Sequence, residues 1–287
     1  MAGIHELLLK LLKKVREFSL LGKVSLIVIL LIFLAALFAP NVSMHSHKSS
    51  SGPALSPPGK DHLLGTDDLG IDLWAQICHG ARISLIVGFG TAFLAALGGG
   101  LIGIIAGYLG GWIDKVIMRM IDIMIVLPDF PLMIVLAAFL GPSVLNIIIV
   151  LALFSWVFPA RIVRSQILML KEHSYIKSAE TYGAGAWYLM WKHFFPAVFP
   201  LMAVNMIRLT GRAIVSEAGL SFLGLGDPTS KSWGLIINHA TSFRGIYFTE
   251  FWKWWLLYPW LALTLIVLSL AFISRELERI VNPRLRS

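Results

Sequence analysis

Six apolar runs, each about as long as the hydrocarbon core of a bilayer is thick, constrain this chain more than any other feature. They cover residues 20–38, 83–109, 116–140, 144–163, 197–222 and 256–273. Charged residues make up 14% of the chain, against about 25% in soluble domains. Lipid accepts only helices or closed barrels as spanning structures, and these runs exceed the roughly 10 residues of a barrel strand. The sequence therefore predicts an all-α integral membrane protein with six transmembrane helices.

These runs divide the chain into membrane and flanking segments. Residues 1–19 are amphipathic and basic, which predicts a cytoplasmic helix lying on the inner leaflet. Residues 20–38 follow this basic flank as in a signal peptide, but the run is long and no small-residue cleavage site follows it. We therefore interpret it as a retained first transmembrane helix. An external loop at 39–82, with a flexible leader rich in Ser, Pro and Gly, precedes a core membrane domain at 83–274.

The distribution of Lys and Arg predicts the orientation of the chain. With the N-terminus inside, the cytoplasmic pieces, including a tail at 275–287, carry 16 of the 24 Lys and Arg residues, and the external pieces carry 6. Cytoplasmic loops of membrane proteins carry such an excess. We therefore expect a multi-pass protein of the cell membrane with both termini cytoplasmic. The net charge of +8 then reflects topology and inner-leaflet lipids, and we expect no nucleic-acid partner because the sequence has no folded basic module.

A polar stretch rich in small residues, 175–196, interrupts the apolar runs within the predicted cytoplasmic segment 164–196. A short amphipathic helix here can seat in a groove of a soluble partner if small residues let its backbone approach closely. Ala179 and Gly183 are spaced i to i+4 and would share one face of that helix, and the glycines that follow would end it. The residues expected to form this docking element are Tyr175, Lys177, Ser178, Ala179, Glu180, Gly183, Ala184 and Pro196.

Charged side chains inside the spans are costly, about 2.5–3.5 kcal/mol each, and need a physical reason. Asp129 lies near the middle of the third run, beside two prolines that are expected to bend the helix. It could line a pathway and meet a cationic amine or metal ion, or form a structural contact with Arg208, Arg212 or a partner subunit. Asp122 is expected to pair with Arg119 at i,i+3 spacing. The candidate pathway residues are Asp129, Glu217, Arg208 and Arg212.

Two further patterns inside the spans predict packing. Glu217 is interpreted as a packing or gate-stabilising group rather than a determinant of specificity. Small residues permit close helix crossing, so the glycines of the second run predict a tight interface, expected to face a partner subunit. These glycines are Gly88, Gly90, Gly98, Gly99, Gly100, Gly103 and Gly107.

Motifs for chemistry are missing from the sequence. It contains no GxxxxGK[ST] phosphate loop, no HExxH, no CxxC and no nucleophile elbow. Cys78 is the single cysteine and excludes an internal disulfide. His45, His47 and His62 lie in the predicted flexible leader and could bind a transition metal, but solvated loop histidines are more common, so no metal ligand is assigned. The sequence therefore predicts neither an enzyme nor a resident cofactor.

Three blocks, in order and spacing, carry a resemblance to a known family. They are LGTDDLGIDLWAQICHGARISLIVG at 64–88, the cytoplasmic stretch 175–196, and SEAGLSFLGLGDPTSKSWG at 216–234. The chain resembles the inner-membrane permease subunits of ATP-binding cassette importers, in the second-permease branch of the dipeptide, oligopeptide and nickel group. The family's cytoplasmic signature is matched here by Ala179, Gly183 and Pro196. It departs at Lys177, Ser178, His193 and Phe195, and Ile71 stands where the family usually has Arg.

The resemblance implies a type I importer fold in which the stretch around Ala179 and Gly183 is the coupling helix. It implies four partners for this chain: a homologous second permease, two cytoplasmic ATPases that bind ATP and Mg²⁺, and an extracytoplasmic solute-binding protein. The cargo stays open among dipeptides, oligopeptides, nickel chelates and related solutes. Two alternatives remain: an ATP-independent secondary carrier or channel, which would need coupling residues in its own helices and no cytoplasmic dock, and an assembly scaffold without transport.

Overall fold

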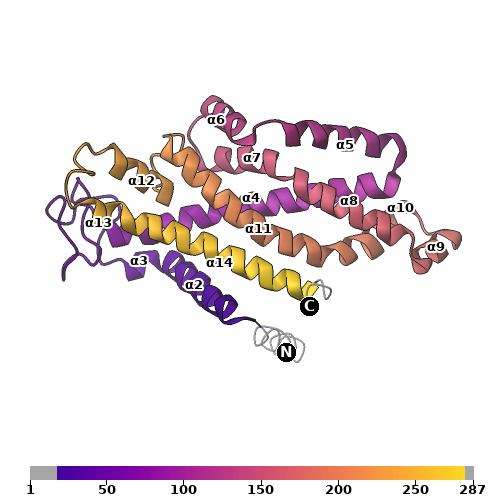
Figure 1. The fold of residues 1–287 in the computed structure, drawn as a ribbon, viewed down its shortest axis with the longest axis horizontal. Helices are drawn as coiled ribbons and strands as arrows, with labels where there is room; N and C mark the ends of the chain where they lie inside the picture. The colour runs from indigo at the N-terminus through magenta and orange to yellow at the C-terminus, as the bar shows by residue number, and fades with distance from the viewer. Residues whose placement is uncertain (1–17, 282–287) are drawn as a thin grey trace.

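The computed structural model describes residues 18–281, and within this range the regular elements are helices, with one isolated β-bridge between Thr66 and Asp72 (Figure 1). In chain order they are α2 (Leu20–Leu37), α3 (Ala39–Val42), α4 (Leu73–Leu109), α5 (Gly111–Val126), α6 (Asp129–Leu140), α7 (Val144–Ser155), α8 (Val157–Lys171), α9 (Ser174–Thr181), α10 (Ala186–Leu189), the π-helix η1 (Met190–Phe194), α11 (Phe195–Phe222), α12 (Trp233–Ser242), α13 (Trp252–Trp255) and α14 (Leu257–Val281). The predicted all-α membrane fold is confirmed.

The six predicted spans correspond to four continuous stretches and two broken ones. α2, α4, the stretch Ala186–Phe222 and the stretch Trp252–Ile280 are each long and apolar enough to cross a membrane. Two bent pairs, α5 with α6 and α7 with α8, bring the number to six if each pair is one span. The bend expected beside Asp129 in the run 116–140 is therefore confirmed, whereas the bend within the run 144–163 was not predicted.

Prolines explain both breaks. α5 and α6 meet at an angle of 93° across Leu127 and Pro128, and a proline has no N–H for the helical ladder. Asp129 consequently begins α6 instead of lying in the middle of a continuous helix. The second pair bends by 42° after Ser155, and Pro159 lies four residues further on, where its ring would clash with the Ser155 carbonyl in a regular helix.

The connection predicted to be external is shorter and more ordered than expected. α4 begins at Leu73 because Asp72 caps it, with the Asp72 Oδ1 accepting a hydrogen bond of 2.8 Å from the Ala75 N–H. Residues 73–82, predicted as loop, are therefore the first turns of α4. The leader is not a free coil, since the Leu55 N–H donates to the Asp67 carbonyl at 2.9 Å and the Thr66 N–H to that of Ser56 at 3.0 Å.

α4 forms the centre of the bundle, and its glycines pack within this chain. A Cβ atom on Gly99 would lie 2.3 Å from the Trp156 carbonyl oxygen at the start of α8, and one on Gly103 would lie 2.5 Å from the Ala160 carbonyl oxygen. Glycine thus lets α4 and α8 approach backbone to backbone. The expectation that the glycine interface faces a partner subunit was wrong for these positions. Gly98, by contrast, has no atom within 4 Å of such a Cβ.

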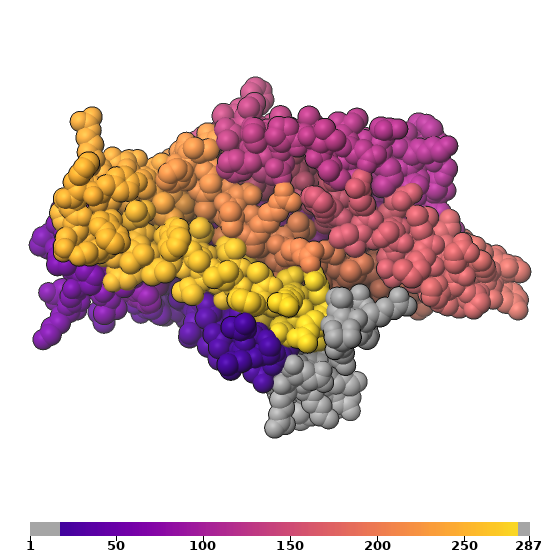
Figure 2. Space-filling view, viewed as in Figure 1, coloured from indigo at the N-terminus to yellow at the C-terminus, as the bar shows by residue number. Residues whose placement is uncertain are grey.

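The two ends of the bundle carry different elements. α9 projects at one end, and α3, α12, α13 and the loop before α4 gather at the other (Figures 1 and 2). α14 runs to Val281, so most of the predicted tail is a continuation of the last span. The predicted interfacial helix at 1–19 lies almost entirely outside the described residues, as does the tail after Val281.

Candidate docking and pathway sites

The projecting element is anchored by one side chain. Ile176 of α9 is 1% exposed and belongs to a buried cluster with Ile167, Leu189 and Phe194. The preceding turn is fixed as well, because the Lys171 Nζ at the end of α8 donates to the Tyr108 carbonyl of α4 at 2.9 Å. These contacts hold α9 against the ends of α4 and α8.

Gly183 ends α9 by backbone conformation. Its φ is +87°, a region that glycine enters at little cost. The Gly183 N–H donates to the Glu180 carbonyl at 2.9 Å and the Ala184 N–H to that of Ala179 at 3.0 Å, the pattern of a Schellman cap. Ala179 is half-buried and packs with Ala184 on the Ile176 cluster. The shared face of Ala179 and Gly183 is therefore explained by packing and chain reversal inside this protein.

The outer surface of this element is polar and aromatic. Tyr182 is 91% exposed and Tyr175 is 47% exposed, and Ser178 and Glu180 are exposed beside them. Lys177 pairs with Glu172 at 2.7 Å, and this hydrogen bond lowers the pKa of the Glu172 carboxyl. Pro196 lies exposed in the first turn of α11. These side chains remain exposed, so the rest of the described chain does not cover the outer surface of α9.

Sequence reasoning missed the anchor of this surface. Ile176 is the only long aliphatic residue between Leu170 and Leu189, and that isolation was a usable signal. The irregular link to α11 was also missed: α10 continues into the π-helix η1, whose Phe194 is fully buried. Wide π turns have little sequence signature and depend on tertiary packing.

A second set of candidate residues lies where helices of the bundle meet in pairs of opposite charge. Arg212 of α11 pairs with Asp129 of α6, and Arg208 pairs with Glu278 of α14. Asp122 of α5 pairs with Arg161 of α8 at 2.5 Å, so the predicted Arg119–Asp122 pair was wrong. Folding of α5 and α6 across α8 and α11 brings these partners together, so proximity in the sequence does not determine which charged residues pair.

These pairs are exposed at the surface of the chain. Arg212 and Asp129 side chains are 47% and 40% exposed, and Arg161 and Asp122 are each 49% exposed. Two adjacent hollows follow the same face, and both are lined by Phe158 and Arg212. The guanidinium carbon of Arg212 lies 5.7 Å from the centroid of the Phe158 ring. Because exposed ions are costly in lipid, this face requires water or another protein against it.

Glu217 lies inside the chain, away from the charged face. It is 1% exposed, and its two oxygens accept hydrogen bonds from Ser221 of α11 at 2.7 Å and Ser84 of α4 at 3.2 Å. The carboxylate therefore ties α11 to α4. This geometry agrees with its interpretation as a packing group and gives it no contact with either hollow.

A polytopic helical bundle with charged pairs on one face and the helix α9 projecting at one end is consistent with the membrane component of a transporter. Residues 99–287 match the family described as "Binding-protein-dependent transport system inner membrane component", and this chain belongs to that family. The resemblance inferred from the sequence motifs is confirmed, and the chain is a permease component of an inner-membrane transport system.

Curated relatives agree over most of the chain. The oligopeptide transport system permease protein OppC of Bacillus subtilis (strain 168) is 35% identical over 268 residues, which cover 93% of this chain and 86% of the relative. The dipeptide transport system permease protein DppC of the same strain is 35% identical over 271 residues, 93% of this chain and 82% of the relative. The glutathione transport system permease protein GsiD of Pectobacterium atrosepticum is 35% identical over 231 residues, 80% of this chain and 75% of the relative.

Proposed function

We propose that this chain forms half of the membrane pathway of an ATP-driven importer for peptides, and that α9 is the element on which a cytoplasmic ATPase docks. The observation that carries the proposal is the projection of α9 from the end of α4 and α8, held by Ile176 and the Gly183 turn, with Tyr182 91% exposed. A rigid link between a dock and two central helices is what a subunit needs if it is to convert closure of a separate motor into helix movement.

The partners follow from this arrangement. We infer that ATP and Mg²⁺ bind to two ATPase subunits and that this chain needs no resident cofactor. A homologous permease would cover the charged face, so that the Asp129–Arg212 and Arg208–Glu278 pairs line a shared aqueous pathway. An extracytoplasmic solute-binding protein would dock at the opposite end of the bundle, on the surface formed by α12, α13 and the loop before α4. The α9 end then faces the cytoplasm, in agreement with the excess of basic residues predicted for that side.

The chemistry of the charged face supports a peptide as cargo. A peptide carries an ammonium group, a carboxylate and polar amides, and Asp129 and Arg212 offer a partner for each terminal charge. The three relatives named above are permeases for oligopeptides, dipeptides and glutathione, all of which contain these groups. We infer that Asp129 and Arg212 exchange their mutual ion pair for the termini of a passing peptide, as ions in a transport pathway can.

The dock is tested by Tyr182→Ala in the assembled complex, with Tyr247→Ala at the opposite end as the matched control, since Tyr247 is also exposed. Loss of a central aromatic contact typically weakens an interface by about 2 kcal/mol or more, roughly 30-fold. Tyr182→Ala and Tyr182→Glu should reduce retention of the ATPases on tagged permease, and Tyr247→Ala should not. Full ATPase retention and peptide-stimulated hydrolysis in both Tyr182 variants would refute the assignment.

A further inference from the structure

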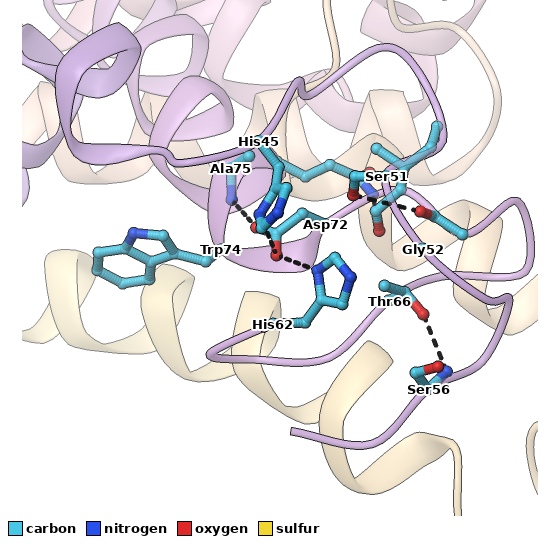
Figure 3. Close-up of polar contacts among 12 residues, drawn as sticks. His45, Ser51, Gly52, Ser56, His62, Thr66, Asp72, Trp74 and Ala75 are labelled. Atoms are coloured by element: carbon cyan, nitrogen blue, oxygen red, sulfur yellow. Dashed lines mark hydrogen bonds and ion pairs between the residues drawn. The ribbon is translucent and has the colours of Figure 1, made fainter. Parts of the chain in front are cut away.

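Two histidines and an aspartate from separate parts of the chain meet beside the start of α4 (Figure 3). His45 follows α3, His62 lies in the loop before α4, and Asp72 is the cap of that helix. One ligand atom from each residue lies within 4.8 Å of the others. The side chains of His62 and Asp72 are 8% and 3% exposed, and that of His45 is 30% exposed. The cluster is thus shielded from solvent but open on the His45 side.

The distances fit a small metal ion. His62 Nδ1 lies 2.8 Å and His45 Nδ1 lies 3.7 Å from the Asp72 Oδ2. Zinc bonds of about 2.0–2.2 Å in tetrahedral geometry place neighbouring donors about 3.4 Å apart. The two separations from Asp72 bracket that value, and all three donors lie within 4.8 Å of one another, which is within reach of one ion after side-chain adjustment.

The surroundings fix two of the donors in place. The Asp72 Oδ1 is occupied by the Ala75 N–H at 2.8 Å, which turns the Oδ2 toward the imidazoles. The His62 ring lies beneath Gly52, where an added Cβ would come within 2.3 Å of the His62 Nε2. Outer contacts of this kind orient the ligands of metal sites. They leave His62 Nδ1 directed at the carboxylate, as Figure 3 shows.

We propose that His45, His62 and Asp72 bind a divalent transition-metal ion of the zinc class, with water as the fourth ligand. Two imidazole nitrogens favour zinc, copper or nickel, whereas magnesium and calcium prefer oxygen ligands throughout. The ion would join the chain after α3, the loop before α4 and the α4 cap at one point. Without the ion, these three segments are joined through hydrogen bonds of the loop. The ion would therefore brace the surface on which, in the proposed function, a soluble receptor docks.

The proposal is tested on the assembled complex, stripped with a chelator and then loaded with Zn²⁺ alone. Bound metal is measured by mass spectrometry, and Co²⁺ loading reports tetrahedral nitrogen and oxygen ligation through its visible absorption. We expect one ion per chain in the wild type, and its loss in His62→Ala, His45→Gln and Asp72→Asn. The Asp72→Asn variant keeps the helix cap, because Asn caps as well as Asp, so its loss of metal cannot be attributed to unfolding of α4.

His47→Ala is the matched control, since His47 lies two residues from His45 but stacks on His79, with ring centroids 3.7 Å apart. It should retain the ion. Zinc should also raise the melting temperature of the wild type and of His47→Ala, and leave Asp72→Asn unchanged. A wild-type complex that stays metal-free in excess zinc would overturn the proposal and leave a hydrogen-bonded His62–Asp72 pair. Equal metal content in the wild type and Asp72→Asn, or metal that is lost only with His47, would overturn it as well.

Discussion

The contact between α4 and α8 yields the sharpest prediction, because the same methyl group can be added to α4 at a close contact or in open space. Gly103→Ala places a Cβ 2.5 Å from the Ala160 carbonyl oxygen and 3.0 Å from the Val163 Cβ. An ordinary contact begins at 3.4 Å, so the two helices must separate by about 1 Å at this point. The nearest atom belongs to the backbone and cannot rotate away. Gly98→Ala, on the same helix, places its Cβ where no atom lies within 4 Å.

The magnitude follows from two opposing terms. Replacement of glycine by alanine inside a helix gains about 1 kcal/mol of helix propensity. Overpacking of a closely packed contact costs about 1–3 kcal/mol. The propensity gain is common to both variants and cancels, so Gly103→Ala should be about 1–3 kcal/mol less stable than Gly98→Ala. For a chain of this size the corresponding gap in melting temperature is about 2–4 °C for each kcal/mol.

The assay is thermal unfolding of the purified chain in detergent, followed by size-exclusion chromatography of the soluble fraction. The yield of assembled complex is measured separately, because Gly98 remains available to a partner subunit. If Gly98→Ala lowers the yield of assembled complex without lowering the melting temperature of the isolated chain, it identifies a partner contact. Equal melting temperatures for Gly103→Ala and Gly98→Ala would refute the inference that glycine at 103 is required for the α4–α8 contact.

Three further predictions concern topology and the ion-pair network. Tyr182 and Phe248 are each 91% exposed and lie at opposite ends of the bundle, so cysteines at these positions should react with an impermeant maleimide from opposite sides of the membrane. The native Cys78 is buried and should give little background labelling. Labelling of Tyr182→Cys from outside intact cells would reverse the proposed orientation. Asp129→Arg and Arg212→Asp should each lower the melting temperature, and the double variant should recover most of the loss, with a coupling free energy of about 0.5–3 kcal/mol. In proteoliposomes the double variant should still import cationic peptides poorly relative to neutral ones. Equal uptake of cationic and neutral peptides would exclude a pathway role for this ion pair. Glu217→Leu should cost about 1–3 kcal/mol more than Glu217→Gln, because leucine leaves the buried Ser84 and Ser221 hydroxyls without this acceptor; equal melting temperatures would show that the hydrogen bonds do not tie α4 to α11.

Local chemistry explains what sequence reasoning found. Lipid imposes a length and an apolar composition on every span, so the all-α class and the approximate position of each helix could be predicted from the chain alone. The small residues and polarity of the stretch around Gly183 likewise marked α9 and its terminating turn. The three motif blocks carried the family, because their residue types and spacing are specific enough to be recognised without coordinates.

Contacts between distant segments explain what sequence reasoning missed. Asp122 has Arg119 one turn away, yet it pairs with Arg161 at 2.5 Å, because α5 lies against α8 in space. The same holds for His62, which composition placed in a flexible leader and which nevertheless meets Asp72 at 2.8 Å, because hydrogen bonds with neighbouring turns order the leader.

The sequence by itself therefore determined that this protein lies in a membrane, the approximate position of its helices and its family, because each depends on the residues of one segment and on the medium around it. The tertiary structure alone decided that Gly99 and Gly103 face α8, that Asp129 meets Arg212 and that His45 and His62 converge on Asp72. Hydrophobic composition is nearly uniform around a membrane helix, so it contains little information about which face meets which neighbour. Close packing and charge pairing between distant segments supply that information only when the bundle has formed.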